Sequence, residues 1–244
     1  MVPGLFDAEE MELLLNVGRA DDQRMKQVTG RLDAQGGVSK LWLTHDLDEG
    51  IYSAFVRSES VVNTMEALLG GEVYHYHHKM MVKEPYVGGA WEWHQDYGYW
   101  YNNGCLFPDM ASCMIAVDRA SRENGCLQVI AGSHRMGRIE HGKSGEQTGA
   151  DQARVDLALE HLELVYCEME PGTALFFHSN LLHRSDQNRS ANPRWTLICC
   201  YNRADNPCLD KPGHPSYRYL ERWPDERIRE LGRRQWAELQ AVGR

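Results

Sequence analysis

The chain has 244 residues and a formal net charge of -9, with 42% hydrophobic and 25% charged residues. This balance is typical of a globular protein and excludes a fibrous repeat or a largely disordered chain. The acidic excess argues against a nucleic-acid partner, because it repels a phosphate backbone and no long run of Lys and Arg offsets it.

The first residues and the cysteines bear on where the protein resides. Residues 1–15 carry acidic side chains where a secretory signal needs a basic start and an apolar stretch, and no segment is apolar over the length of a membrane span. We therefore expect a cytoplasmic protein with no membrane partner. The seven cysteines contain no Cys-x-x-Cys pair and lie mostly in apolar stretches, so we expect reduced, buried thiols. They are Cys105, Cys113, Cys126, Cys167, Cys199, Cys200 and Cys208.

The first third of the chain is predicted to be mainly helical. Asp7 followed by Glu10 fits a capping box at the start of a first helix, which we expect to end near Gly18. A short strand is expected over residues 41–44. Residues 58–69 place apolar side chains at helical spacing, and the two glycines that follow are typical of a helix end.

The middle of the chain consists of short runs of aromatic and branched residues separated by Gly, Pro and Asn. Many short strands at this spacing predict a mainly β fold with flanking helices, built as a barrel or a double sheet. The candidate strands are 73–82, 90–96, 112–118, 126–130, 162–167, 174–177, 183–185 and 194–201.

We expect a single domain over residues 1–244. The segment 134–161 is polar, contains several glycines and separates two of the predicted strands, which favours a mobile lid beside a pocket. Residues 224–239 have the apolar spacing of an amphipathic helix. The expected parts are a helical N-terminal part over about 1–70, a core over about 71–205 and a C-terminal helical segment over about 215–244.

One short motif carries chemistry, Trp-His-Gln-Asp at 93–96. On a strand, His94 and Asp96 would point to the same face, because side chains alternate along a strand. An imidazole and a carboxylate belong to the facial triad that leaves positions open on iron(II), although imidazole also suits zinc and copper. A third ligand is needed, and His183, which follows the predicted strand 174–177, is the candidate.

Several further segments accompany this motif in a fixed order. They are Trp-x-Trp-His-x-Asp at 91–96, Asn-Gly-Cys-Leu-Gln-Val-Ile-Ala-Gly-Ser-His-Arg at 124–135, Pro-Gly-Thr at 171–173, Phe-Phe-His-Ser at 176–179 and His-Arg-Ser at 183–185. Together they resemble the phytanoyl-CoA dioxygenase family of iron(II)- and 2-oxoglutarate-dependent oxygenases, in particular its ectoine hydroxylase-like branch.

This resemblance implies a double-stranded β-helix core, the jelly-roll fold of the cupins. It also implies an iron(II) ion held by His94, Asp96 and His183, with 2-oxoglutarate and dioxygen as co-substrates. The implied reaction is hydroxylation of an unactivated C–H bond, with release of succinate and carbon dioxide. Asp96 favours hydroxylation over halogenation, because related halogenases have a small residue there that lets halide reach the iron.

The resemblance also implies which residues bind 2-oxoglutarate. In the family, an arginine eleven residues after the second histidine binds the far carboxylate, and that position is Arg194 here. A guanidinium matches a carboxylate with its planar fork. Ser185 would donate a hydrogen bond to the same carboxylate. His77 and Lys79, which share a face of a strand, are further candidates for the co-substrate site.

The substrate is predicted less sharply. Trp100 matches an aromatic substrate position of the ectoine hydroxylase branch, and Tyr97 and His75 are further candidates, His75 because it would share a strand face with His77. Ordinary core packing is the alternative for each. The polar and aromatic surroundings favour a small polar metabolite, such as an amino acid or a betaine-like compound. Desaturation, ring closure and epimerisation stay open as outcomes.

Two other classes of function fit the same motif. One is a cupin-like zinc or manganese enzyme that does not use 2-oxoglutarate, and such an enzyme would have no use for a carboxylate clamp at Arg194 and Ser185. The other is a non-catalytic relative that binds a metal or a small molecule. Metal analysis combined with a 2-oxoglutarate turnover assay separates the three hypotheses.

Overall fold

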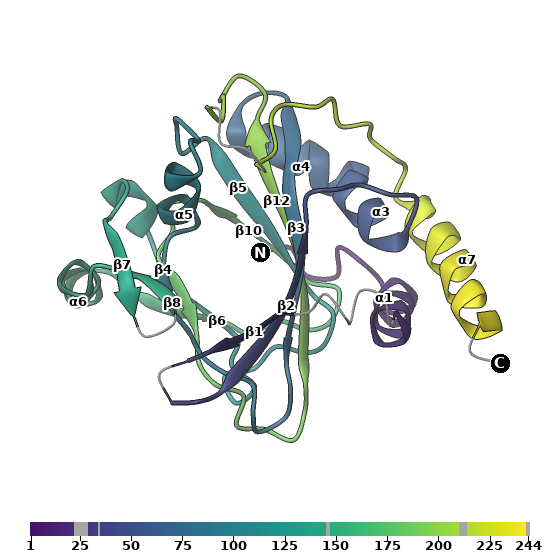
Figure 1. The fold of residues 1–244 in the computed structure, drawn as a ribbon, viewed down its shortest axis with the longest axis horizontal. Helices are drawn as coiled ribbons and strands as arrows, with labels where there is room; N and C mark the ends of the chain where they lie inside the picture. The colour runs from purple at the N-terminus through teal and green to yellow at the C-terminus, as the bar shows by residue number, and fades with distance from the viewer. Residues whose placement is uncertain (22–28, 34, 145–146, 210–213, 243–244) are drawn as a thin grey trace.

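The structure, a computed structural model, describes residues 1–21, 29–33, 35–144, 147–209 and 214–242. Two antiparallel sheets curve around a common interior, and helices cover one outer side (Figure 1). Neighbouring strands in each sheet come from distant parts of the chain, so residues far apart in the sequence meet in the interior.

The larger sheet has six strands in the order β1-β2-β3-β12-β5-β10. Its central strands β3, β12 and β5 are buried almost throughout, because helices cover one face and the second sheet covers the other. The six strands are β1 (Thr29–Leu32), β2 (Val38–Thr44), β3 (Val73–Lys83), β12 (Arg194–Arg203), β5 (Met110–Ala116) and β10 (Ala174–His178).

The smaller sheet has four strands in the order β4-β11-β6-β9. The three-residue strand β11 pairs with β4 on one side and with β6 on the other. A separate two-stranded hairpin lies beside β4 (Figure 1). The strands are β4 (Trp91–His94), β11 (His183–Ser185), β6 (Leu127–Ile130) and β9 (Leu164–Cys167), and the hairpin is β7 (His141–Ser144) with β8 (Gln147–Ala150).

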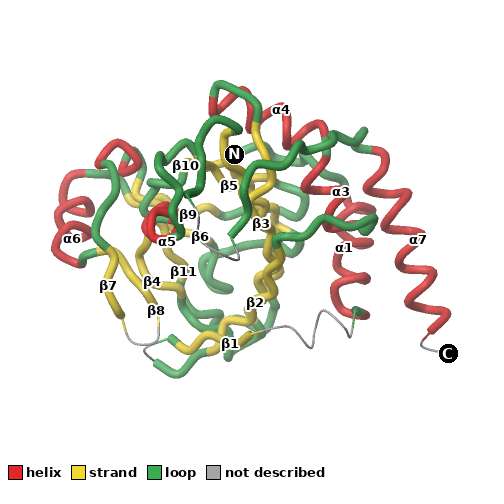
Figure 2. The backbone as a smooth tube through the Cα atoms, turned by 45° about the horizontal axis from the view of Figure 1, so that its top comes forward, coloured by secondary structure: helices red, strands yellow, loops and turns green. Residues whose placement is uncertain are grey.

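Four helices pack on the outer face of the six-stranded sheet (Figure 2). Their apolar side chains, among them Leu14, Phe55 and Ile228, are completely buried against residues of the sheet such as Leu197. Burial of each such side chain contributes about 1.5–3 kcal/mol. The helices are α1 (Ala8–Ala20), α3 (Ile51–Arg57), α4 (Glu59–Leu69) and α7 (Glu226–Val242). No helix in the described ranges is long and apolar enough to cross a membrane.

The predicted start of α1 and the predicted end of α4 are confirmed. At α1, the Asp7 carboxylate accepts from the Glu10 amide at 3.0 Å, and the Glu10 carboxylate accepts from the Asp7 amide at 2.8 Å, which completes the capping box. At the end of α4, Gly70 adopts the left-handed conformation with φ 75. The helix α3 was not predicted.

One prediction for the middle of the chain was wrong, and one segment has more regular structure than its sequence suggested. The strand predicted over 90–96 ends at His94, and Asp96 begins a short helix, α5 (Asp96–Asn102). The segment 134–161 is mostly regular structure: it contains the end of a 3-10 helix (Ser133–Met136), the β7–β8 hairpin and α6 (Gln152–His161).

Candidate metal centre

The side chains of His94, Asp96 and His183 converge from three elements. His94 ends β4, Asp96 begins α5 and His183 begins β11. His94 and His183 are direct partners across the antiparallel β4–β11 pair, and their ring centroids are 4.1 Å apart. One ligand atom from each of the three residues lies within 4.8 Å of the others. The structure thus brings the three predicted ligands together.

Both imidazoles are oriented by backbone carbonyls. Nδ1 of His94 lies 2.7 Å from the carbonyl oxygen of Glu92, and Nδ1 of His183 lies 2.9 Å from that of Leu181. A proton on each Nδ1 satisfies these contacts and leaves the Nε2 lone pairs for a metal. Burial lowers the pKa of both histidines, so both are neutral and able to bind a cation.

Asp96 is buried, and Ser112 holds its carboxylate. The Ser112 hydroxyl donates to Oδ2 at 2.8 Å, and Oδ1 lies 3.9 Å from Nε2 of His183. Burial acts to raise the pKa of Asp96, but the charge of Lys79 and the hydrogen bond from Ser112 act against it, and the pKa lies below its ordinary value. Two neutral imidazoles and one carboxylate fit iron(II) and leave positions for further ligands.

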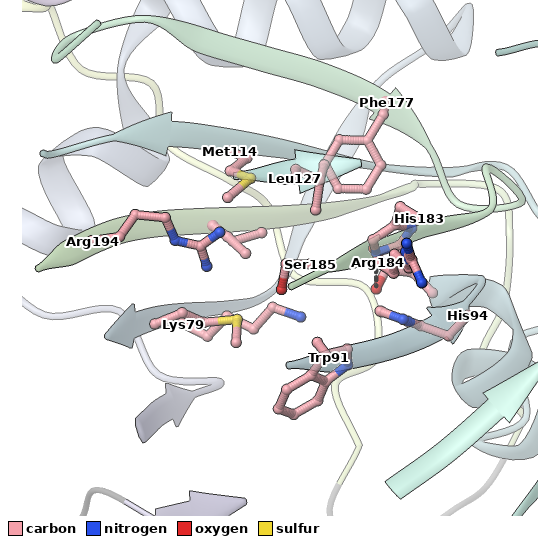
Figure 3. A pocket seen from close by; sticks show the side chains of 13 residues that line it. Lys79, Trp91, His94, Met114, Leu127, Phe177, His183, Arg184, Ser185 and Arg194 are labelled. Atoms are coloured by element: carbon pink, nitrogen blue, oxygen red, sulfur yellow. Dashed lines mark ion pairs between the residues drawn. The ribbon is translucent and has the colours of Figure 1, made fainter. Parts of the chain in front are cut away.

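The three ligands line one cavity, together with side chains from both sheets (Figure 3). No described residue of 134–161 lines the cavity, so the lid over this segment stays a prediction. The lining residues are Lys79, Met81, Trp91, His94, Asp96, Met114, Leu127, Phe177, His183, Arg184, Ser185, Arg194 and Ile198.

Arg194 begins β12 and directs its guanidinium into the cavity, towards Ser185 (Figure 3). The side chain is 1% exposed, and burial lowers its pKa to about 10. Nη1 donates to the carbonyl of Gly125, whereas Nε has no partner, and no carboxylate of the described residues pairs with Arg194. A buried cation without a counter-charge is costly, so this end of the cavity is suited to an anionic ligand.

Lys79 reaches the same cavity from β3, and its ammonium points between Ser185 and His94 (Figure 3). Its charge acts on Asp96 across the cavity. Among the described residues, nothing forms a hydrogen bond or an ion pair with the Lys79 ammonium. The predicted co-substrate residues Arg194, Ser185 and Lys79 therefore surround one space.

Two of the three histidines of β3, His75 and His77, were predicted to line the site, and neither lines this space. A β-bulge leaves Tyr76 without a partner on β12, so His75 and His77 do not share a strand face. The prediction that they do was wrong, because the bulge interrupts the alternation of side chains. His75 instead contacts His78, with 3.0 Å between Nε2 and Nδ1, and neither His75 nor His77 lines the cavity.

Trp100 lies in the interior beside His77, not in the cavity lining. Its ring centroid is 5.3 Å from that of Tyr76 and 5.7 Å from that of His77. The aromatic side chain of α5 that approaches the metal ligands is Tyr99, whose ring centroid is 5.6 Å from that of His94. The sequence offered several aromatic residues here and no signal that selected Tyr99.

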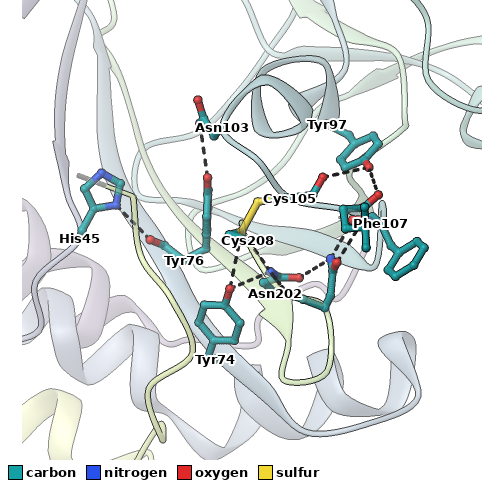
Figure 4. Close-up of a disulfide and its surroundings, with 11 residues drawn as sticks. His45, Tyr74, Tyr76, Tyr97, Asn103, Cys105, Phe107, Asn202 and Cys208 are labelled. Carbon is teal, nitrogen blue, oxygen red and sulfur yellow. Dashed lines mark hydrogen bonds between the residues drawn. A yellow bond between two sulfur atoms is a disulfide. The ribbon is translucent and has the colours of Figure 1, made fainter. Parts of the chain in front are cut away.

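Tyr97 is anchored to the loop after α5 rather than to the cavity. Its hydroxyl donates to the carbonyl of Leu106 at 2.8 Å and approaches that of Cys105 at 3.2 Å (Figure 4). With its hydroxyl satisfied by the backbone and its ring 4% exposed, Tyr97 holds this loop. Its predicted contact with substrate finds no support in this geometry.

The same loop carries a disulfide between Cys105 and Cys208 (Figure 4). The prediction that all seven cysteines are reduced was therefore wrong for these two. The segments after α5 and after β12 run antiparallel at this point and bring the two sulfurs together, although they are 103 residues apart in the sequence. The five remaining cysteines are free and buried.

Two supporting residues were not predicted. Ser112 holds Asp96 from β5. Lys83 is 0% exposed and is the direct partner of Arg194 in the β3–β12 ladder, and its ammonium donates to the carbonyl of Asp186. No short motif contains either residue, and only the pairing of the strands reveals their positions.

Known proteins share both the sequence pattern and the fold. A profile of the phytanoyl-CoA dioxygenase (PhyH) family matches residues 1–196. The L-proline trans-4-hydroxylase of Streptomyces griseoviridis is 34% identical over 201 residues, which cover 75% of this chain and 72% of that protein. The ectoine dioxygenase of Halomonas elongata is 27% identical over 242 residues, with 92% of this chain and 73% of that protein covered.

The crystal structure of EctD from S. alaskensis in its apoform has a TM-score of 0.74 and 21% sequence identity, over 90% of this chain and 81% of that one. This likeness, with two antiparallel sheets around one interior, confirms the predicted double-stranded β-helix core. The match over residues 1–196 and the identity to the proline hydroxylase together establish the family. This chain belongs to the phytanoyl-CoA dioxygenase family.

Proposed function

We propose that this protein is an Fe(II)- and 2-oxoglutarate-dependent dioxygenase that hydroxylates a small polar metabolite and releases succinate and carbon dioxide. His94, Asp96 and His183 would hold the iron, and Arg194 would bind the far carboxylate of 2-oxoglutarate. Bound iron and 2-oxoglutarate supply the activation of dioxygen, which protein side chains do not provide. The residues of the chain bind, orient and shield the reactants.

The observation that carries this proposal is the unneutralised Arg194 in the cavity of the metal ligands. Its guanidinium is buried and has no carboxylate partner among the described residues. A dicarboxylate with one end at the metal and the other at Arg194 would supply the missing charge and use the fork of the guanidinium. A cupin-like zinc or manganese enzyme without 2-oxoglutarate would gain nothing from such a residue.

Two further groups would orient the co-substrate. Ser185 is 4% exposed and belongs to the same cavity as Arg194, so its hydroxyl is available to a carboxylate there. The Lys79 ammonium would reduce the repulsion between Asp96 and a second carboxylate that approaches the metal. The apolar walls of the cavity, such as Phe177 and Ile198, would limit the entry of water.

For the substrate, we propose a small polar metabolite and favour a free amino acid. The identity to L-proline trans-4-hydroxylase supports this class. A second support is His77, whose Nε2 is buried beside Trp100 and has no hydrogen-bond partner in the described part of the chain. A polar group of a substrate would satisfy this nitrogen, so we place His77 on the substrate side rather than with 2-oxoglutarate.

We also propose that residues 1–244 act as one domain. The early strands β1 and β2 extend the same sheet that β12 and β10 complete, so the N-terminal part and the core share their backbone hydrogen bonds. The cytoplasmic location and the absence of nucleic-acid and membrane partners stay predictions.

Reconstitution of the metal-free protein tests the function. With Fe(II), we expect succinate release that depends on 2-oxoglutarate and is stimulated by one member of a panel of free amino acids, cyclic amines and acyl-CoA esters. His94→Ala, Asp96→Ala and His183→Ala should each abolish iron binding and turnover, whereas His161→Ala, at an exposed position of α6, should retain both.

Three outcomes separate the hypotheses. Iron binding with succinate release supports the proposal. Tight binding of zinc or manganese without consumption of 2-oxoglutarate would instead favour the cupin-like enzyme, and a wild-type protein that binds no metal would leave only a non-catalytic relative.

A further inference from the structure

The β7–β8 hairpin lies against the strand that carries the first metal ligand, yet it contributes nothing to the cavity. Figure 1 shows the hairpin beside β4, and none of its described residues is among those that line the cavity. Any influence of the hairpin on the metal centre therefore passes through β4 and the start of α5.

His141 on β7 binds the backbone between two metal ligands. Its Nε2 accepts a hydrogen bond at 2.9 Å from the amide of Gln95, which separates the first histidine ligand from the aspartate. Its Nδ1 lies 2.8 Å from the carbonyl of Ile139, so the proton resides on Nδ1 and Nε2 is free to accept. The ring lies directly on Gly98, where a Cβ would overlap it.

The side chain of Gln95 joins both segments that carry metal ligands. It is completely buried, and its Nε2 donates to the carbonyls of Gly137 at 2.8 Å and Asn180 at 2.7 Å. Its Oε1 accepts from the amide of Ile139 at 2.7 Å. Asn180 lies three residues before His183. Gln95 therefore links the segment of His94 and Asp96 and the segment of His183 to the loop that leads into β7.

Gln147 on β8 fixes the other end of the ligand strand. Its Oε1 accepts from the amide of Glu92 at 3.0 Å, and its Nε2 donates to the carbonyl of Ala90 at 3.0 Å. The carbonyl of Glu92 is the acceptor that orients His94. The hairpin therefore holds the chain on each side of this histidine, at Glu92 within β4 and at Gln95 directly after it.

We propose that the β7–β8 hairpin positions the metal centre, with His141, Gln147 and Gln95 as positioning residues that hold the ligand strand in its metal-binding geometry. This inference rests on the metal centre of the proposed function. None of the three side chains touches the cavity, so each acts through the backbone or through a ligand's hydrogen-bond acceptor. Loss of partners that orient metal ligands typically weakens metal affinity by about 10- to 100-fold.

The test measures Co(II) binding to the metal-free protein by anaerobic calorimetry, the visible absorption spectrum of the Co(II) complex, and the Tm of the metal-free protein. His141→Leu removes the acceptor, His141→Gln restores one, and Gln147→Met removes the second contact to β4. Asp151→Ala is the matched control, because Asp151 lies in the same segment and caps α6 without contacting β4.

We expect His141→Leu and Gln147→Met to weaken Co(II) binding by about 10- to 100-fold and to change the Co(II) spectrum. His141→Gln should recover most of the affinity, and Asp151→Ala should lower the Tm but leave the affinity and the spectrum unchanged. Wild-type affinity in both His141→Leu and Gln147→Met would overturn the inference and leave the hairpin a purely structural role. If the wild-type protein itself bound no Co(II), the proposed function would be at fault.

Discussion

Two buried cations lie side by side where β3 meets β12. Lys83 and Arg194 are direct partners in the ladder and are 0% and 1% exposed. Their hydrogen bonds go to the carbonyls of Asp186 and Gly125, and within the described ranges neither forms an ion pair with a carboxylate. Burial lowers the pKa of both, and the charge of Arg194 lowers that of Lys83 further. This end of the cavity lacks the negative charge that a dicarboxylate would bring.

Arg194→Ala should mainly weaken the binding of 2-oxoglutarate. A hydrogen bond to a charged group contributes about 1.5–3 kcal/mol, which corresponds to a KM for 2-oxoglutarate about 10- to 150-fold higher. Steady-state assays at saturating substrate should show a smaller change in kcat, because no metal ligand is lost. Arg122→Ala, at an exposed surface pair with Glu168, is the control and should leave KM unchanged. An unaltered KM in Arg194→Ala would show that the clamp is misassigned.

Lys83 should make the stability of the metal-free protein depend on pH. The folded protein binds the Lys83 proton more weakly than the unfolded chain does, because burial and Arg194 lower its pKa. Between that lowered pKa and the ordinary value of about 10.4, the unfolded state holds more protons, so the contribution of Lys83 to stability increases with pH. The slope can reach about 1.4 kcal/mol per pH unit.

Urea unfolding followed by tryptophan fluorescence checks this prediction. As the pH rises towards the ordinary lysine pKa of about 10.4, the free energy of unfolding of the wild type should rise relative to that of Lys83→Met, which lacks the titrating group. Lys40→Met should show no such trend, because Lys40 is partly exposed and pairs with Glu84. A wild-type to Lys83→Met difference that stays constant over this range would contradict the prediction.

Single residues could be predicted from the sequence where a short linear pattern contains them. His94 and Asp96 share one motif, and Arg194 stands eleven residues after His183, the interval at which the family resemblance implied an arginine. Ser112 could not be found in this way, because its role depends on which strand faces Asp96. The same limit applies to every contact that strand pairing creates.

At the scale of elements, the junction of β4 and α5 explains one result. The sequence correctly predicted that the side chains of His94 and Asp96 meet, but the reason given for it was wrong. Strand alternation predicted that His94 and Asp96 share a face, yet the strand ends at His94 and a helix begins at Asp96. The aromatic side chains of α5 have a strand preference, so the sequence concealed the helix. A contact from outside supports it: the Tyr99 hydroxyl donates to the carbonyl of Thr148 at 2.6 Å. Tertiary contacts of this kind can hold residues in a helix even where their intrinsic propensity favours a strand.

Replacement of Gly172 by alanine, in the turn before β10, should destabilise the protein. Gly172 has φ +81, and a Cβ there would overlap the carbonyl oxygen of Phe6, whose amide donates back to Gly172 at 3.1 Å. Gly132 has a similar φ of +82 with open space around it. Gly132→Ala should therefore lose about 1–3 kcal/mol from backbone strain alone, and Gly172→Ala should lose more, because the N-terminal segment must also move. Urea unfolding of both variants measures the difference, and equal losses would show that the contact with Phe6 adds no cost.

At the scale of the whole molecule, the net charge is negative, whereas the charge around the cavity is locally positive. The chain has a net charge of -9, but Lys79, Lys83 and Arg194 gather at one end of a single cavity or directly behind it. From the composition we expect no nucleic-acid partner, but the composition could not show where these cations gather. The number and spacing of the strands predicted a barrel or a double sheet, and the family resemblance implied the jelly roll. The order of the strands depends on long-range pairing that no local pattern encodes.

The Cys105–Cys208 disulfide links the loop after α5 to the segment after β12, and it should stabilise the entire fold. In the unfolded chain it closes a loop between residues 103 positions apart, and constraints of this kind typically contribute about 2–4 kcal/mol. Thermal unfolding of the metal-free protein should therefore show a Tm about 4–16 °C lower in a thiol reductant. The Cys105→Ser/Cys208→Ser variant should unfold at the lower temperature with or without reductant, because the other five cysteines are free and leave no second bond to break. A wild-type Tm that does not respond to the reductant would mean that the two sulfurs are unbonded in solution, as expected of a protein kept in a reducing cytoplasm.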